Sequence, residues 1–165
     1  MAFVEPVTLE GYGLRVLPLA LEHEAGLRAA AADGALWTIR VTSVPEPENT
    51  HKYIEDALAM REAGNRFAFV VQDAASGKVL GCSSYHDILP AVKRVEIGYT
   101  WYAKSVQRTH VNTACKLLLA EDIPAAVLQS QELKTALPPL AGALLKNEQD
   151  VTLFEKLMFM QRHNR

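Results

Sequence analysis

The sequence predicts a mixed α/β domain of the α+β kind, with a mostly antiparallel central sheet flanked by helices. Three observations predict this fold class. Two apolar runs, residues 67–72 and 79–86, are separated by the turn sequence Ala75–Lys78, as in a β-hairpin. Residues 95–102 then alternate with the period of a strand, which places Glu96, Thr100 and Tyr102 on one face. From Val111 the apolar residues change to the period of a helix.

Two short strands are expected near the beginning of the chain, at Val7–Glu10 and Leu14–Leu19. The glycines in the turn sequence Gly11–Gly13 separate them. The alanine-rich stretch Leu21–Ala32 favours a helix, because alanine has the highest helix propensity, and Asp33-Gly34 ends it.

Two prolines predict a loop over Val41–Glu48, because proline interrupts regular structure. Asn49 or Thr50 then caps a second helix, since short polar side chains accept hydrogen bonds from the first free backbone N–H groups. This helix should end near Ala63, where Gly64 follows.

The region after Glu121 has a different character, with several prolines and no convincing strand. Two stretches in it, Ala125–Thr135 and Val151–Gln161, are plausible helices. The chain is therefore expected to form one domain, residues 1–165, with an atypical helical segment at 122–165.

Composition excludes several classes of protein. The 165 residues carry a net charge of −2, with 49% hydrophobic and 22% charged residues, as in an ordinary globular domain. A general nucleic-acid or membrane-surface binder would need a basic excess. The two cysteines make no disulfide framework and no metal-ligand spacing, and we find no signal peptide or membrane-spanning run. A cytoplasmic protein that binds no nucleic acid, membrane or metal is expected.

The segment Glu96–Lys116 carries the clearest functional signal, because it reads as a strand, a short loop and the first turn of a helix. The beginning of a helix leaves backbone N–H groups unpaired and carries a partial positive charge. Such a junction binds phosphate. The sequence therefore predicts a phosphorylated cofactor at the end of this strand.

Four sequence patterns carry a resemblance to a known family. They are Val7-Thr-Leu-Glu-Gly with Leu14-Arg-Val-Leu-Pro-Leu, Leu36-Trp37 with Thr42-Ser-Val-Pro45, the hairpin Phe67–Tyr85, and Val95–Ala103 followed by Val106–Thr113. Through them residues 7–121 resemble the GCN5-related N-acetyltransferase (GNAT) superfamily, and within it the ribosomal-protein N-terminal acetyltransferases. Residues 122–165 depart from this pattern.

The resemblance implies acetyl-CoA as co-substrate and transfer of its acetyl group to a primary amine, either a protein N-terminus or a small molecule. The pyrophosphate loop would be Gln107–Asn112, with His110 and Asn112 at positions where the family has small residues. The implied cofactor-binding residues are Thr100, Trp101, Tyr102, Gln107, Arg108, Thr109, His110, Val111, Asn112 and Thr113.

The proton of the attacking amine requires an acceptor, and Glu96 is the catalytic candidate, acting directly or through water. The alternative is a rim glutamate that makes a salt bridge. His86 and His110 are weaker candidates, because a single histidine near a loop is more often structural. Trp37 and Tyr85 are candidates for the amine-binding cleft, with ordinary packing as the alternative.

The later part of the family pattern, a strand–helix–strand unit that completes the cofactor cleft, is not recognisable after Asp122. No tyrosine follows Tyr102 to protonate the leaving thiolate. The strand at 96–102 is therefore expected to have an unpaired edge, which the helices of the tail or a second copy of the chain, as in a homodimer, would have to cover. Two further readings stay open: a relative that binds CoA or a protein partner without turnover, and a structural fragment that is stable only as an oligomer.

Overall fold

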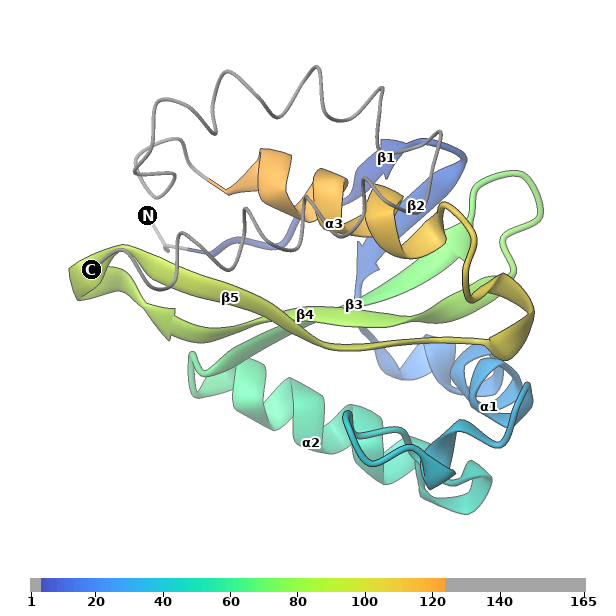
Figure 1. Ribbon diagram of the computed structural model, residues 1–165. Helices are drawn as coiled ribbons and strands as arrows, with labels where there is room; N and C mark the ends of the chain where they lie inside the picture. The colour runs from blue at the N-terminus through green and yellow to red at the C-terminus, as the bar shows by residue number, and fades with distance from the viewer. Residues whose placement is uncertain (1–3, 124–165) are drawn as a thin grey trace.

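The computed structural model describes residues 4–123, and Figure 1 shows their arrangement. The order of elements is strand, strand, helix, helix, three strands, helix, as the sequence predicts. Short 3₁₀ turns join several of them. The main elements are β1 (Leu9–Gly11), β2 (Leu14–Pro18), α1 (Glu24–Ala32), α2 (Thr50–Glu62), β3 (Arg66–Asp73), β4 (Val79–Leu89), β5 (Arg94–Tyr102) and α3 (Val111–Asp122). Only the first two residues of the expected segment 122–165 belong to the described part, so its predicted helices lie outside the described residues.

The sheet is antiparallel throughout, and its spatial order β1-β2-β3-β4-β5 is the order of the chain. β5 is the last strand of this order. Its outer edge therefore pairs with no other strand among residues 4–123. The predicted fold class is confirmed, including the hairpin between β3 and β4.

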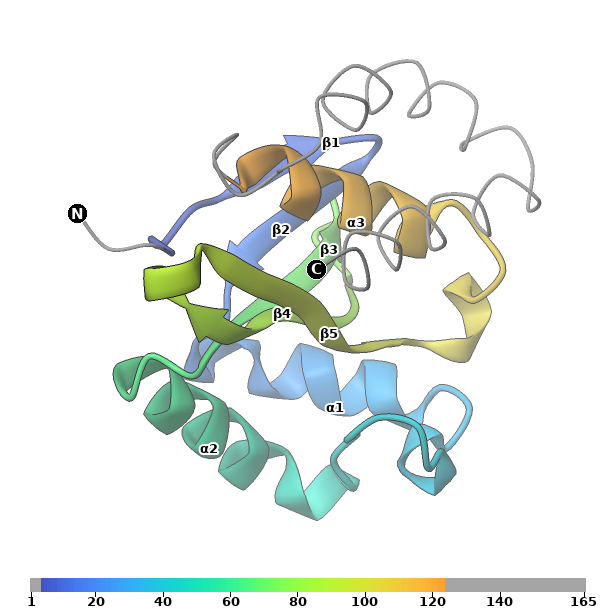
Figure 2. The same cartoon turned by 60° about the vertical axis from the view of Figure 1, so that its left-hand side comes forward.

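Helices cover both faces of the sheet. α3 lies across one face, and α1 and α2 lie side by side on the other (Figures 1 and 2). The core is accordingly divided into two layers. Leu14, Phe69, Tyr85 and residues of α3 fill the first layer, whereas residues of α1 and α2 pack against Val70, Cys82 and Trp101 in the second.

The long apolar run of β3 is buried on both faces, which explains why it shows no alternation between apolar and polar residues. Gly81 of β4 lies very close to its neighbour: a Cβ at this position would be 2.1 Å from the Trp101 carbonyl oxygen. The pairing of β4 with β5 at the beginning of β4 therefore needs glycine.

A β-bulge divides β5 into two halves. Gly98 pairs with Ser84 and Trp101 pairs with Cys82, so that Tyr99 and Thr100 together oppose the single residue Ser83. Tyr99 has a φ of 50°, in the left-handed region that side chains other than glycine rarely adopt.

The bulge shifts the alternation of side chains by one residue. Tyr102 packs in the α3 layer, whereas Glu96 lies opposite His86 on the face that α1 and α2 cover. The prediction that Glu96 shares a face with Thr100 and Tyr102 is therefore wrong. Its cause is the additional residue in the bulge, which an unbroken period of two in the sequence does not reveal.

Candidate functional site

The site is the junction at which β5 passes through the turn Lys104–Val106 into the loop 107–110 and then into α3. All four loop residues are exposed, whereas Val111 and Thr113 at the beginning of α3 are buried. The helix is therefore anchored by its core face, with its first turn directed toward the loop. The described structure brings the predicted phosphate-loop residues together at one end of the sheet.

Three side chains of the loop make hydrogen bonds to backbone carbonyl oxygens. The Gln107 amide donates to the Tyr102 carbonyl (2.9 Å), and the Thr109 hydroxyl donates to the Val106 carbonyl (2.6 Å). His110 Nε2 donates to the carbonyl oxygen of Tyr12 in the β1–β2 turn (3.1 Å). The His110 imidazole thus ties the loop to the first hairpin, a contact that the sequence pattern does not indicate.

The groups that remain available for an anion are backbone N–H groups and Arg108. The first intrahelical bond runs from Ala114 N–H to the His110 carbonyl (2.8 Å), and the Val111 N–H donates to Thr109 Oγ1 (3.4 Å). The N–H groups of Asn112 and Thr113 therefore have no partner within the helix. Arg108 is exposed, and it makes no ion pair within residues 4–123. Its φ of 58° sharply bends the loop just before the helix. Asn112 is half-buried on the first turn.

The strand residues of the predicted site have different roles. Thr100 Oγ1 lies 2.8 Å from the hydroxyl oxygen of Ser83 and forms a hydrogen bond with it within the bulge. Trp101 and Tyr102 have buried side chains, so only their backbone faces the open edge of β5. Burial also raises the pKa of the Tyr102 hydroxyl, which lies beside the Cys115 thiol.

A buried polar cluster that the sequence does not predict packs against the bulge on the face of the sheet that α2 covers. The Tyr53 hydroxyl of α2 accepts hydrogen bonds from Arg66 Nη2 (2.9 Å) and from Trp101 Nε1 (3.2 Å). Arg66 also donates to Ser84 Oγ (2.9 Å), and its guanidinium covers the Tyr99 ring, with Cζ 4.2 Å from the centroid. An arginine at the beginning of an apolar strand is the only signal in the sequence for this cluster.

Glu96 is held by the charges around it. Arg94 forms an ion pair with its Oε1 and also binds Asp87 (2.5 Å), and His86 Nε2 lies 4.0 Å from Oε2. The Glu96 side chain is 11% exposed, against 25% for His86. Glu96 therefore makes the salt bridge expected of a rim glutamate, and it also lies beside the His86 imidazole.

The two predicted cleft residues lie apart from each other. Trp37 is half-buried in a short 3₁₀ turn, Leu36–Thr38, after α1. Tyr85 is 1% exposed in the α3 layer, and its hydroxyl donates to the Leu119 carbonyl (2.5 Å) and to Asp122 (3.2 Å). Tyr85 is therefore a packing residue of the core, which was the alternative to a role in the cleft, and its hydroxyl is hydrogen-bonded to α3.

Other chemistries find no support in the described residues. Both cysteines are free and buried, and burial raises the pKa of the Cys115 thiol to about 12, so neither is an activated nucleophile. Within residues 4–123 no group of three or more His, Cys, Asp or Glu side chains could hold a metal ion. In the same range no helix is long and apolar enough to cross a membrane.

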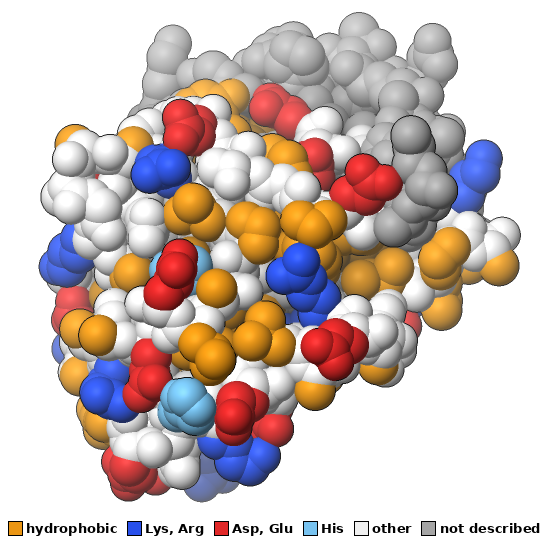
Figure 3. All heavy atoms as spheres, turned by 180° about the vertical axis from the view of Figure 1, so that it is seen from behind, with side chains coloured by type: hydrophobic (Ala, Val, Ile, Leu, Met, Phe, Trp, Pro, Cys, Tyr) orange, Lys and Arg blue, Asp and Glu red, His pale blue; other side chains and the backbone are white. Residues whose placement is uncertain are grey.

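The surface shown in Figure 3 mixes acidic and basic side chains, with hydrophobic atoms between them. This face therefore shows no extended field of one sign, in agreement with the net charge of −2. This face therefore offers no broad basic surface of the kind that binds nucleic-acid phosphates.

Comparisons with known proteins agree with this geometry. Residues 14–136 match the acetyltransferase (GNAT) domain family. A GCN5-related N-acetyltransferase from Brucella melitensis is 25% identical over 74% of this chain and 56% of its own, with a TM-score of 0.62. A putative acetyltransferase from T. thermophilus is 20% identical over 84% of this chain and 77% of its own, with a TM-score of 0.63.

A ribosomal L7/L12 α-N-protein acetyltransferase, RimL, in complex with coenzyme A also shares the fold, at 17% identity, with a TM-score of 0.59. The match covers 70% of this chain and 66% of RimL. The chain thus spans between about half and two thirds of the length of several structures that it resembles. Among curated proteins none matches. Because the family match covers well over half of the chain, the protein belongs to the GNAT acetyltransferase family.

Proposed function

We propose that the chain is an acetyl-CoA-dependent N-acetyltransferase that transfers the acetyl group to a primary amine. The observation that carries the proposal is the continuous path from the open edge of β5 to the first turn of α3. One continuous segment offers backbone hydrogen-bonding groups along the strand and a positive helix end beyond it.

The residues present fit acetyl-CoA. The exposed loop 107–110, Arg108 and the N–H groups of the first turn of α3 would hold the pyrophosphate. The backbone of Thr100, Trp101 and Tyr102 would pair with the extended pantetheine arm. Two of the solved structures that share the fold, RimL and the Microcin C7 self-immunity acetyltransferase MccE, were determined with coenzyme A and with acetyl-CoA and AMP.

The reaction is direct attack of the neutral amine on the thioester carbonyl. A new C–N bond forms, the C–S bond breaks, and its electron pair leaves with the sulfur. The backbone of the β5 bulge is the natural place for an N–H group that stabilises the developing oxyanion. The Glu96 carboxylate belongs to the path that removes the amine proton. Trp37 remains the proposed contact for the amine.

A second candidate is a relative that binds CoA without turnover. One observation favours it: residues 103–165 contain no tyrosine, the residue type that the resemblance implies as the proton donor to the thiolate. A cytoplasmic location and a homodimer formed through the β5 edge complete the proposal. The two free, buried thiols suit a reducing compartment.

Calorimetric titration with acetyl-CoA, followed by thiol release across a panel of amines, tests these candidates. Binding with amine-dependent thiol release supports the enzyme. Binding without release, for every amine, selects the non-catalytic relative. If acetyl-CoA produces no heat at millimolar concentration, both candidates are wrong.

A further inference from the structure

A hollow of about 300 Å³ opens beside the bulge, on the face of the sheet that α2 covers. Its wall is formed by the end of α2, by the residue just before β3 and by the hairpin of β4 and β5. The lining residues are Met60, Asn65, His86, Asp87, Ile88, Leu89 and Tyr99. Its volume is at the lower end of the range for sites that bind small molecules.

His86 is placed next to the bulge by the absence of a side chain at Gly98. A Cβ at position 98 would lie 2.3 Å from His86 Nε2, so the imidazole occupies the space above the glycine. Its ring meets the Tyr99 ring edge to face, with centroids 5.3 Å apart and an interplanar angle of 83°. Tyr99 is in turn covered by Arg66. The imidazole is therefore fixed from two sides, at the residue where β5 bulges.

Glu96 stands behind the imidazole rather than in the hollow. Its Oε1 is taken by Arg94, its Oε2 lies 4.0 Å from His86 Nε2, and it is not part of the wall. Glu96 therefore lies within ion-pair distance of the imidazole without occupying the hollow. The other charged groups around the ring are Asp87 on β4, Arg94 on β5 and Arg66 on β3, while α2 contributes the Tyr53 hydroxyl and the uncharged Met60.

We propose that the His86 imidazole is the group that accepts the proton of the acceptor amine, with Glu96 as its positioning residue. This inference rests on the proposed acetyl transfer. The amine lone pair forms the C–N bond, the thiolate leaves with the electrons of the C–S bond, and the ammonium proton passes to the imidazole. The imidazolium, stabilised by Glu96, then returns the proton to water.

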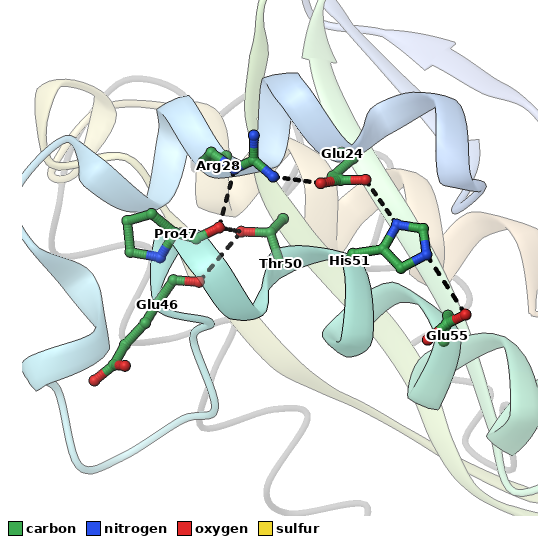
Figure 4. Close-up of polar contacts among 7 residues, drawn as sticks. All are labelled: Glu24, Arg28, Glu46, Pro47, Thr50, His51 and Glu55. Carbon is green, nitrogen blue, oxygen red and sulfur yellow. Dashed lines mark hydrogen bonds and ion pairs between the residues drawn. The ribbon is translucent and has the colours of Figure 1, made fainter.

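The test compares His86→Gln with a matched control, His51→Gln. His51 also pairs with glutamates, at 2.8 Å from Glu24 and 3.5 Å from Glu55, but it lies on the outer surface at the beginning of α2 (Figure 4). The probes are acetyl-CoA and a panel of short peptides with free N-termini and small primary amines. We expect His86→Gln to lower kcat by about 100-fold or more, the usual effect of removing a general base. Acetyl-CoA affinity should be unchanged, and His51→Gln should keep full activity.

Three readouts separate a catalytic from a structural role. The acidic limb of the kcat–pH profile should disappear in His86→Gln. Added imidazole should restore part of the turnover of His86→Ala, because the hollow can admit it, and should not affect His51→Gln. Gly98→Ala, which displaces the ring, should lower kcat and leave acetyl-CoA binding intact.

The outcomes are distinct for the two proposals. A wild-type protein that acetylates no amine overturns the proposed function and this inference with it. A wild-type protein that turns over while His86→Gln retains its kcat and its acidic limb overturns the inference alone. Loss of kcat in His86→Gln without rescue of His86→Ala by imidazole assigns His86 to structure, and also overturns it.

Discussion

The guanidinium of Arg66 lies over the ring of Tyr99, 4.2 Å from its centroid, and so joins the first residue of β3 to the bulge of β5. Arg66 as a whole is 3% exposed, and its guanidinium donates to Tyr53 and Ser84. Planar stacking and a forked set of donors are properties of arginine that lysine does not share.

We therefore expect Arg66→Lys to lower the free energy of unfolding by about 2 kcal/mol, since a buried ammonium cannot replace both hydrogen bonds and the stacking. Urea denaturation measures the difference. Arg61→Lys is the matched control, because Arg61 stacks on Phe67 at 4.4 Å without any hydrogen bond to the described residues. Equal losses in the two variants would refute a special role for Arg66.

The position of Arg108 predicts opposite effects on stability and on binding. A residue with a side chain at a φ of 58° is strained, and glycine relieves this strain. Arg108→Gly should therefore leave the unfolding free energy unchanged or raise it by up to about 1 kcal/mol. It should weaken acetyl-CoA binding by about tenfold, the equivalent of one charge-assisted hydrogen bond.

Denaturation and calorimetry on one variant check both expectations for Arg108. Lys93→Gly is the control, because Lys93 also has a left-handed backbone, with a φ of 50°, and carries a positive charge away from α3. It should gain stability in the same way and bind acetyl-CoA like the wild type. Unchanged binding by Arg108→Gly would exclude the guanidinium from the phosphate site.

The hydrogen bonds of the Tyr85 hydroxyl join β4 to the end of α3, and their contribution to stability can be measured. Its hydroxyl donates to Leu119 and to Asp122, whose own pKa is raised by burial. Tyr85→Phe leaves the buried carbonyl of Leu119 without this donor, and should lower the free energy of unfolding by about 1–2 kcal/mol. Tyr12→Phe should have little effect, because the Tyr12 hydroxyl makes no hydrogen bond within residues 4–123. An equally small effect of Tyr85→Phe in urea denaturation would contradict the prediction.

The pair of His51 and Glu24 predicts a window of pH in which it stabilises the fold (Figure 4). The hydrogen bond with Glu24 raises the pKa of His51 above 6.5, so its contribution is complete below that value and is lost as the pH rises through the raised pKa. The same hydrogen bond lowers the pKa of Glu24 below 4.5, so its contribution is lost as the pH falls through the lowered pKa.

The stability difference between the wild type and His51→Gln should therefore be largest between the two ordinary pKa values, at about pH 5.5, and should be lost as the pH rises through the raised pKa of His51. Denaturation midpoints at several pH values measure it. His23→Gln gives the opposite sign, because burial lowers the pKa of His23 and its protonation destabilises the fold as the pH falls. A difference for His51→Gln that does not depend on pH would show that the ion pair contributes nothing.

The sequence predicts the elements of this fold well, because their signals are local. The apolar run of β3, the turn before β4 and the change of period at Val111 each depend on a few adjacent residues. The bulge at Tyr99 is different, because the alternation in the sequence continues through it without interruption. The bulge arises where two residues of β5 oppose Ser83 across the sheet. Because of it, Glu96 lies on the opposite face from Tyr102, whereas the sequence predicts one shared face.

The candidate site was predictable as a place but not as a set of contacts. The strand–loop–helix junction is visible in the sequence, and the family match extends over residues 14–136. The cluster of Arg66, Tyr53 and Trp101 joins residues up to 48 positions apart, and His110 reaches a carbonyl 98 positions away. No local pattern encodes such contacts, because packing of distant elements creates them.

The agreement between chain order and spatial order in the sheet has a consequence for how the domain assembles. Each strand pairs with the strand synthesised just before it, so the sheet can grow at one edge as the chain is made. The connections between paired strands are short, apart from residues 19–65 between β2 and β3, which contain α1 and α2. α3 is the exception, because it returns across the sheet to β1 and β2, and His110 contacts Tyr12. The slowest step of folding should then be the docking of α3, which also completes the phosphate loop, so that the binding site forms only when the domain closes.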